Sequence, residues 1–328
     1  MKKIINDPNQ VVTEMLDGVV AAYPDQIKRI PDTNVVTKKD APVQNKVGIV
    51  SGGGSGHEPA HAGYIGKGML DAAVAGEVFT SPTPDQVFEA IKAVNGGSGV
   101  LLVIKNYTGD VMNFDMAAEL AEAEGIDVAQ VVVNDDVSID DVEGRRGVAG
   151  TIFVHKIAGA MAEAGASLEE VKNAAEKVIA NVRTMGVALS PCVMPASGNP
   201  SFELGEGEME VGIGIHGEPG IERKPLASAD EIATELTNHV LEDLKLSESD
   251  EVAVMVNGLG ATPEMELHLV NRKVQEILQG KGVKTYKTFV GEYMTSLEMA
   301  GCSVTLLKLD DEMKELLDSP SNAPAFRV

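Results

Sequence analysis

The chain has 328 residues, of which 44% are hydrophobic and 23% are charged, as in a soluble globular protein long enough for two domains. Its formal net charge of −23 argues against nucleic acid and anionic membrane surfaces as partners, because binding to either needs clustered Lys and Arg. No apolar stretch reaches the roughly 18 residues of a membrane span, and the N-terminal residues lack the apolar centre of a signal peptide. Cys192 and Cys302 are too few for a disulfide framework and fit no zinc site. We therefore expect a cytoplasmic protein.

Short apolar runs alternate with amphipathic segments through the first half of the chain. Three β-rich runs lie at residues 46–50, 99–104 and 127–133. Between them, residues 83–94 and 112–125 carry apolar side chains at three- and four-residue spacing, which is typical of helices. This order predicts βαβ units and a parallel sheet.

Two further helices are predicted before the composition changes. One covers residues 151–166, and the next opens with a capping box formed by Ser167 and Glu170. The stretch 187–208 is rich in Pro, Gly and Ser, which indicates a passage between domains. We therefore expect an N-terminal domain over residues 1–186 and a C-terminal domain over residues 187–328.

The second half predicts another, smaller α/β unit. The alternation in residues 208–220 directs one apolar set to a single face of a strand, namely Met209, Val211, Ile213 and Ile215. A helix (227–245), a strand (251–260), a helix (263–280) and two more strands follow. The predicted fold class is thus α/β, with two α/β domains, the first built on a largely parallel sheet flanked by helices.

The glycine-rich turn SGGGSGHEPAHAG, residues 51–63, matches neither common nucleotide-binding motif. The dinucleotide fingerprint needs a third glycine where this chain has His57. A Walker loop needs Gly-Lys followed by Ser or Thr, whereas both Gly-Lys pairs of this chain are followed by Gly.

The same turn formally contains the zinc-protease pattern H-E-x-x-H. That pattern binds metal only when both histidines lie one turn apart within a helix. Pro59 is unfavourable in a helix interior and comfortable at a first helical position, so we expect a helix to begin near Pro59 with His57 in the preceding turn. The sequence therefore predicts no metal site. A turn rich in backbone N–H groups favours a small anionic or hydroxyl-bearing ligand, and a purely structural turn with an incidental His57 is the alternative.

Six motifs occur in the order found in dihydroxyacetone kinases: SGGGSGHEPAHAG, GEVFTSPTPDQ, IKNYTGDVMNF, GRRGVAGT, GIGIHGEPG and NGLGATP. The resemblance covers nearly the whole chain, and several of the motifs have an unusual composition. The sequence therefore resembles the substrate-binding K subunit of that family.

The resemblance implies that dihydroxyacetone is held covalently, as a hemiaminal between its carbonyl carbon and a histidine ring nitrogen. The matching residue is His216, which has the opposite strand parity to the neighbouring apolar residues. His57 and Asp110 match the pair that hydrogen-bonds the substrate and handles protons, so the implied catalytic set is His57, Asp110 and His216. Because ligands bind at the carboxyl ends of parallel strands, we expect His57 and Asp110 at the same sheet edge.

Other substrate contacts are implied by the same motifs. Lys105 matches a substrate-contacting lysine, and Gly54, Ser55 and Gly56 match the backbone cradle of the bound triose. His61 is a candidate for the wall of the site without a catalytic role. We expect His155, in an apolar helix, to be a packed histidine.

The chain carries no nucleotide motif, and its length leaves no room for the helical nucleotide-binding domain of single-chain, ATP-dependent relatives. The resemblance is therefore to the phosphotransferase-system-dependent type, in which a partner L subunit holds ADP and Mg. A multi-phosphoryl M protein recharges that ADP from phosphoenolpyruvate. The implied activity is that of a glycerone kinase working in a homodimer, with no cofactor of its own. Such a division between two subunits is workable because phosphoryl transfer depends mainly on positioning and charge neutralisation.

Two alternatives stay open. Paralogues in this family bind dihydroxyacetone through the same histidine and act as co-activators of a transcription factor. A more distant alternative is a dehydrogenase or sugar-phosphate-binding module that uses the glycine-rich turn. The chain also differs from the family pattern, because the loop at 137–144 is a few residues short, which puts its contacts with a partner subunit in doubt.

Overall fold

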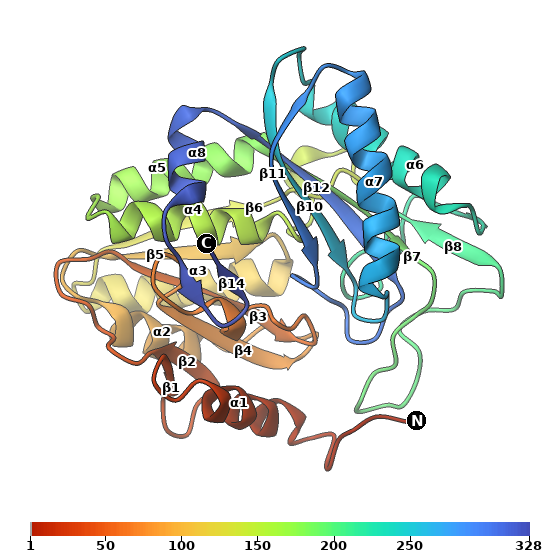
Figure 1. Cartoon of the computed structure of the whole chain (residues 1–328). Coiled ribbons are helices and arrows are strands. Elements are labelled where there is room, and N and C mark those ends of the chain that lie inside the picture. The colour runs from red at the N-terminus through yellow and green to blue at the C-terminus, as the bar shows by residue number, and fades with distance from the viewer. Residues whose placement is uncertain (1) are drawn as a thin grey trace. The chain divides into compact units, whose positions relative to one another are not determined.

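The computed structural model describes residues 2–328, and the chain divides into two compact units (Figure 1). The first unit comprises the chain up to Val133 together with Thr151–Val178 and Met313–Val328. The second unit comprises Asn134–Gly150 and Ile179–Glu312. Each unit combines a sheet with helices, so the predicted fold class of two α/β domains is confirmed.

The first unit is built on a sheet whose central strands run parallel. In spatial order the strands are β1 (Ile27–Arg29), β2 (Val35–Lys38), β4 (Ala72–Val78), β3 (Gly48–Ser55), β5 (Val100–Lys105) and β6 (Val128–Val133). The last four of these pair in parallel, whereas β1 and β2 add to the β4 edge in antiparallel fashion. The parallel register places the carboxyl ends of β3 and β5 at the same edge of the sheet.

Helices pack on this sheet as the alternation of strands and amphipathic segments predicts. They are α1 (Val11–Ala22), α2 (Pro84–Val94), α3 (Thr108–Ala123) and α4 (Thr151–Glu163). α5 (Leu168–Asn181) follows α4 and crosses into the second unit. α2 and α3 share an apolar core with alternate residues of β5, and α4 packs against β3 and β5. Every residue of β5 is buried, as expected for a parallel strand covered on both faces.

The second unit is built on a mostly antiparallel sheet. In spatial order its strands are β11 (Lys284–Gly291), β10 (Glu251–Gly258), β12 (Gly301–Leu309), β7 (Val182–Ala188), β8 (Glu208–Val211) and β9 (Glu222–Pro225). β10 and β11 run parallel, and the other neighbouring pairs run antiparallel. Two helices, α6 (Ala229–Leu244) and α7 (Glu264–Gly280), complete the layer.

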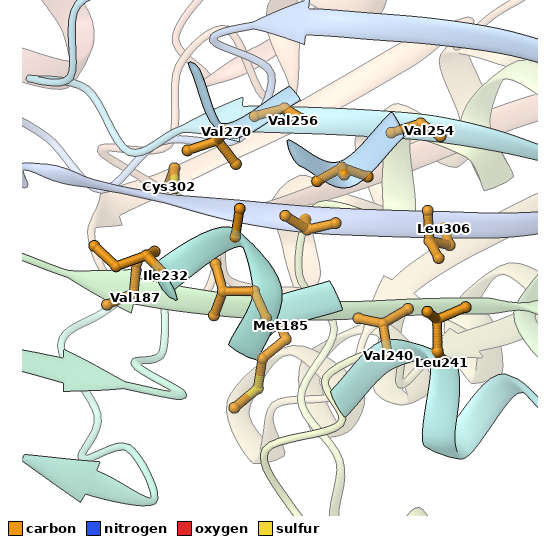
Figure 2. Packing of buried hydrophobic residues seen from close by; sticks show 14 of the residues in the cluster. Met185, Val187, Ile232, Val240, Leu241, Val254, Val256, Val270, Cys302 and Leu306 are labelled. Atoms are coloured by element: carbon orange, nitrogen blue, oxygen red, sulfur yellow. The ribbon is translucent and has the colours of Figure 1, made fainter. Parts of the chain in front are cut away.

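The core of the second unit lies between these two helices and one face of the sheet (Figure 2). Met185 and Val187 of β7 pack there with Val240 and Leu241 of α6. α6 begins at a full capping box, in which Ser228 accepts from the Glu231 N–H and the Glu231 carboxylate accepts from the Ser228 N–H. α6, which contributes Ile232, Ala233, Leu236, Val240 and Leu241 to this core, is therefore fixed at its first turn.

The division into units differs from the boundary expected between residues 186 and 187. β7 begins at Val182 and pairs with β12, so the second unit starts before the Pro- and Gly-rich stretch. The segment 134–150 also belongs to the second unit, and the chain returns to the first unit for its last residues through α8 (Asp311–Asp318), β13 (Asn322–Ala323) and β14 (Phe326–Arg327). Composition cannot reveal such crossings, because they depend on long-range strand pairing.

One local prediction in the second unit is wrong. The strand expected over 208–220 ends at Val211, because Gly212 adopts a positive φ of 79° and turns the chain. Ile213 and Ile215 are nevertheless buried, so their alternation reports burial rather than strand. No helix in the described chain reaches the length and apolar character that crossing a membrane requires.

Candidate functional site

The glycine-rich turn begins inside β3, which runs on to Ser55 and includes three of the glycines. A Cβ on Gly53, which has a positive φ of 153°, would lie 2.2 Å from the Lys105 Nζ and 3.4 Å from the Asp110 Oδ2. A Cβ on Gly54 would lie 2.6 Å from the Thr80 backbone nitrogen. Glycine is therefore required here for the close approach of a charged side chain and of a neighbouring loop.

His57 lies just beyond β3 and is fully buried. Its ring stacks on Phe79, with centroids 5.1 Å apart and planes 13° apart. The Gly56 N–H donates to both carboxylate oxygens of Glu58, at 3.2 and 3.1 Å. Burial raises the pKa of Glu58, although backbone hydrogen bonds oppose the rise. One N–H group of the turn is thus engaged by the chain itself.

The helix expected to begin near Pro59 is absent. Residues 58–61 form turns, and only a short 3-10 helix, η1 (Ala62–Tyr64), follows. An X-Pro pair suits a turn as well as a first helical position, and here the turn prevails. The expectation that His57 precedes any helix still holds.

Lys105 and Asp110 lie together at the carboxyl end of β5. Lys105 is the last residue of β5, and Asp110 lies in the first turn of α3. Their side chains are buried, and the Lys105 Nζ donates to the Asp110 Oδ2 at 3.4 Å and to the Gly52 carbonyl oxygen at 2.8 Å. The structure thus brings Lys105 and Asp110 to the glycine-rich turn, as the strand ends predicted.

A cavity of about 400 Å³ adjoins the same turn within the first unit. Gly53, Gly54, Glu58 and His61 line it on the side of the turn, and apolar side chains of α1 such as Leu16 line the opposite side. Most of this lining is apolar, as in many small-molecule pockets.

His216 belongs to the second unit, in a turn five residues after β8 ends at Val211. Its side chain is 20% exposed, and its Nδ1 lies 2.7 Å from the Glu218 Oε1. The His216 backbone N–H donates to the other carboxylate oxygen of Glu218 at 2.9 Å. A Cβ on Gly214 would lie 2.1 Å from that oxygen, so glycine is needed for Glu218 to fold back.

The pair has a defined protonation pattern. Burial would raise the pKa of Glu218, but the hydrogen bond and charge of His216 outweigh it and lower that pKa to about 2. The ionised carboxylate accepts from Nδ1–H, so a neutral His216 ring carries its lone pair on Nε2. This is the arrangement of a nucleophile oriented by an adjacent carboxylate.

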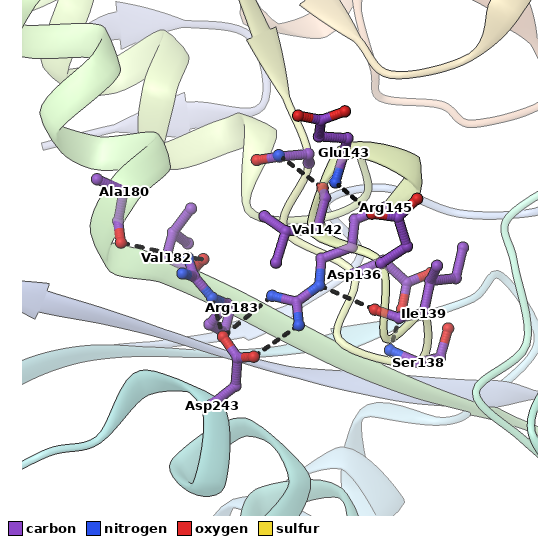
Figure 3. Close-up of polar contacts among 12 residues, drawn as sticks. Asp136, Ser138, Ile139, Val142, Glu143, Arg145, Ala180, Val182, Arg183 and Asp243 are labelled. Atoms are coloured by element: carbon purple, nitrogen blue, oxygen red, sulfur yellow. Dashed lines mark hydrogen bonds and ion pairs between the residues drawn. The ribbon is translucent and has the colours of Figure 1, made fainter.

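The loop that carries the GRRGVAGT motif is held by ion pairs inside the second unit (Figure 3). Arg145 donates to both carboxylate oxygens of Asp243, at 3.0 and 2.6 Å, and to the Ile139 carbonyl oxygen at 2.9 Å. Arg183 also donates to Asp243. The short segment 137–144, which contains the 3-10 helix η2 (Val142–Gly144), is therefore tied to α6.

Arg146 and Asp135 fix the rest of this loop. Arg146 donates to the Asp136 carboxylate at 2.7 Å and to the Gly212 carbonyl oxygen at 2.9 Å, which links the loop to the segment that carries His216. Asp135 accepts from the N–H groups of Val148 and Gly150, at 2.8 and 2.7 Å, while burial raises its pKa to about 6. Within residues 2–328, no group of three or more His, Cys, Asp or Glu side chains could hold a metal ion.

Glu218 and His155 were not predicted to act at the site, and His61 was expected only in its wall. Glu218 follows His216 by two positions, and a carboxylate that close to a proposed nucleophile was a usable signal. His61 and His155 form a hydrogen-bonded pair next to Lys105. They are 94 residues apart, so no local pattern could have linked them.

A Dak1 domain model matches residues 17–325, and the chain belongs to the Dak1 domain family. The resemblance to the K subunit of dihydroxyacetone kinases is confirmed by curated relatives. One is "PTS-dependent dihydroxyacetone kinase 1, dihydroxyacetone-binding subunit DhaK" of Listeria innocua, 58% identical over 95% of both chains. Another is the "PEP-dependent dihydroxyacetone kinase, dihydroxyacetone-binding subunit DhaK" of Escherichia coli, 45% identical over 99% of both chains.

Two solved structures share the fold closely. The "Dihydroxyacetone kinase operon co-activator Dha-DhaQ" aligns with a TM-score of 0.90 and 39% identity over 98% of both chains. The dihydroxyacetone kinase of C. freundii aligns with a TM-score of 0.92 and 36% identity. That alignment covers 99% of this chain and 60% of the C. freundii chain.

Proposed function

We propose that this chain is the dihydroxyacetone-binding subunit of a phosphoenolpyruvate-dependent dihydroxyacetone kinase. It binds dihydroxyacetone and positions a substrate hydroxyl to receive a phosphoryl group, which gives dihydroxyacetone phosphate. The observation that carries the proposal is 58% identity over 95% of both chains to a subunit named for that binding. The oriented His216 supports the covalent form of binding.

The covalent step follows from the His216–Glu218 pair. Nε2 of the neutral imidazole attacks the carbonyl carbon of dihydroxyacetone, the C=O π bond breaks, and its electron pair moves to oxygen. The resulting alkoxide takes up one proton from solvent, and the imidazolium gives its Nδ1 proton along the hydrogen bond to the Glu218 carboxylate, which releases it to solvent, so that one proton enters and one leaves. The product is a neutral hemiaminal that contains every atom of the triose, because no water leaves.

The first unit supplies the remaining groups of the proposal. Asp110 acts as the base toward the hydroxyl that is phosphorylated, and His57 acts as an acid/base and orienting group. Lys105 contacts the substrate, and Gly54, Ser55 and Gly56 provide the backbone cradle. The burial of Lys105 and Asp110 supports these roles, since charged groups act more strongly where water is excluded.

The phosphoryl donor is proposed to lie outside this chain. The names of the relatives specify dependence on the phosphotransferase system or on phosphoenolpyruvate. We therefore propose a nucleotide-binding L subunit, with ADP and Mg, as the direct partner, and a multi-phosphoryl M protein as the indirect one. A homodimer of this chain belongs to the same proposal, and light scattering of the purified protein measures it.

A second candidate function is favoured by one comparison. The co-activator structure aligns over 98% of both chains, so the second candidate for this chain is a regulatory protein that binds dihydroxyacetone without catalysis. Reconstitution separates the two functions, because only the kinase subunit yields dihydroxyacetone phosphate when supplied with L subunit, M protein and phosphoenolpyruvate.

Native mass spectrometry with and without dihydroxyacetone tests the binding proposal. We expect an adduct equal to one whole triose in the wild type and in His268→Ala, since His268 is exposed on α7, and no adduct in His216→Ala. An adduct that persists in His216→Ala would contradict the anchoring role of His216. A wild type without any adduct would overturn the proposed function itself.

A further inference from the structure

A chain of four polar side chains runs through the interior of the first unit. The Lys105 ammonium contacts the Asp110 carboxylate on one side and lies 3.1 Å from the His61 Nε2 on the other. The His61 Nδ1 lies 3.1 Å from the Nε2 of His155, which belongs to α4. All four side chains are buried, with Lys105 only 1% exposed. Buried polar groups in such a series need matched donors and acceptors.

The Lys105 ammonium has three N–H donors and no acceptor. Its three contacts are the Gly52 carbonyl oxygen, the Asp110 Oδ2 and the His61 Nε2. Each proton therefore has one acceptor, provided that the His61 Nε2 is unprotonated. The count closes only with His61 included, because the other two contacts leave one ammonium proton without an acceptor.

This requirement fixes the protons along the rest of the series. With Nε2 accepting, neutral His61 carries its proton on Nδ1 and donates it to the His155 Nε2. His155 must then carry its own proton on Nδ1. Among residues 2–328, no hydrogen-bond partner of the His155 Nδ1 is found. Besides His61, the ring of Tyr64 lies near His155, with 6.2 Å between the ring centroids.

Both histidines are neutral in this environment. Burial lowers the pKa of His61 well below its usual value, and the charges of Lys105, His155 and His57 lower it further. Burial and the Lys105 charge lower the pKa of His155 to about 3. A second positive charge beside Lys105 is thus disfavoured, and the imidazoles act as neutral acceptors and donors.

We propose that His61 and His155 are positioning residues that hold the Lys105 ammonium against the glycine-rich turn, with both imidazoles in the Nδ1–H tautomer. A neutral acceptor suits this task, because a second carboxylate in place of His61 would cancel the positive charge that Lys105 offers. The inference rests on the proposed function and deepens it: because its three protons are engaged within the chain, the ammonium held in this way acts on the substrate through its positive charge.

The tautomers are measured directly by 15N NMR of histidine-labelled protein without any ligand. We expect His61 and His155 each to show a protonated Nδ1 and an unprotonated Nε2. In Lys105→Met the donor is lost, so the His61 tautomer is no longer fixed and its Nε2 signal shifts. A protonated Nε2 on His61 in the wild type, or a spectrum unchanged in Lys105→Met, would overturn the inference.

Two amide variants of His61 separate positioning from simple packing. The Gln amide reaches the place of Nε2 and can accept from Lys105, whereas the Asn amide reaches the place of Nδ1 and can contact only His155. We expect His61→Asn to raise the dihydroxyacetone concentration that half-saturates the adduct by roughly 10- to 100-fold, as for loss of a hydrogen bond to a charged group, and His61→Gln to raise it much less.

Equal effects of the two variants would reject the role of His61 in positioning Lys105, because both place an amide of similar size in the same pocket. The wild-type adduct serves as the reference for these titrations. If the wild type forms no adduct, the proposed function fails, while the NMR tautomers still decide whether the histidines hold Lys105.

Discussion

Glu218 fixes which nitrogen of the His216 ring carries the proton. An isolated imidazole exchanges its proton between two nitrogens, whereas a carboxylate 2.7 Å from Nδ1 keeps the proton there. Because the pKa of Glu218 is lowered to about 2, this carboxylate is ionised throughout the neutral range. His216 thus presents the same nitrogen at every pH at which the ring is neutral.

Glu218→Gln tests this effect. The amide has nearly the same shape but no charge, so it can donate to the ring as easily as accept from it. We expect dihydroxyacetone adduct formation on His216 to slow by roughly 10- to 100-fold, which corresponds to the loss of a charge-assisted hydrogen bond. Native mass spectrometry of samples taken at set reaction times measures the rate of adduct formation. Glu222→Gln, which changes an exposed side chain on β9, serves as the control. A variant as fast as the control would contradict the orienting role.

Sequence patterns located the candidate site better than they described its interior. The glycine-rich turn and Asp110 lie at strand ends, as the alternation of strands and helices predicts. The contact between His61 and His155 depends on how α4 packs against the sheet, which no short motif encodes. Glu218 lay within a quoted motif, but its return to His216 depends on a glycine at 214 that admits its carboxylate.

At the scale of elements, the loop between β6 and α4 depends on charge rather than apolar packing. Asp243, near the end of α6, accepts from both Arg145 and Arg183. The hydrogen bond from Arg145, followed by the interactions with Arg183, lowers the pKa of Asp243 to about 2 although burial opposes the shift. One carboxylate thus joins a loop, a strand and a helix of the second unit.

We expect Asp243→Asn to lower the free energy of unfolding of the second unit by about 2–3 kcal/mol, because two guanidinium groups lose their anionic acceptor while Arg145 stays buried. Denaturant unfolding measures the change. Glu276→Gln, which removes an exposed ion pair on α7, is the matched control and should leave stability essentially unchanged. Equal stability of both variants would show that the Asp243 network is replaceable by solvent.

The strand error at residues 212–215 has a general cause. Alternation predicts a strand when every second residue is buried, and here the burial is real. Gly212 nevertheless turns the chain after Val211. The Arg146 guanidinium donates a hydrogen bond to the Gly212 carbonyl oxygen. The Gly212 N–H still donates to the Gly186 carbonyl oxygen of β7, whereas the Gly212 carbonyl oxygen is bound by a side chain from another loop.

For the whole molecule, the two units are expected to respond differently to acid. In the first unit the pKa values of His61 and His155 are lowered from 6.5, so the folded state binds fewer protons than the unfolded state. The contribution of both histidines to stability is present above about pH 6.5 and is lost as pH falls, in the case of His155 toward its folded pKa of about 3, by at most about 1.4 kcal/mol per pH unit for each histidine. Glu58, whose pKa is raised, offsets part of this loss.

In the second unit, the carboxylates that stabilise the fold are protonated only at lower pH. The lowered pKa values of Glu218 and Asp243 contribute stability above about pH 4.5, which is lost as pH falls toward 2. Asp135, with its pKa raised to about 6, contributes in the opposite direction. Its contribution to stability is complete below pH 3.8 and is lost as pH rises through 6.

Hydrogen exchange measured by mass spectrometry at about pH 7 and about pH 5 tests the difference between the units. After correction for the intrinsic exchange rate, we expect peptides of β3, β5 and α4 to lose protection first, while peptides of β7, β10 and β12 keep it. His155→Gln should weaken the dependence in the first unit. Loss of protection in the second unit before the first would contradict the assignment of the buried histidines as the acid-sensitive groups.

The path of the chain between the units bears on how the protein is made. Residues 313–328 complete the first unit, where the Ala325 N–H donates to the Gly63 carbonyl oxygen and the Asn322 N–H to that of Lys67. The Lys156 ammonium donates to the carbonyl oxygens of Leu316 and Ser319. During synthesis, domains ordinarily fold in the order in which they emerge. Here the unit that holds the earliest strands also needs residues 313–328, so it can close only after the whole of the second unit, which ends at Glu312, has been synthesised.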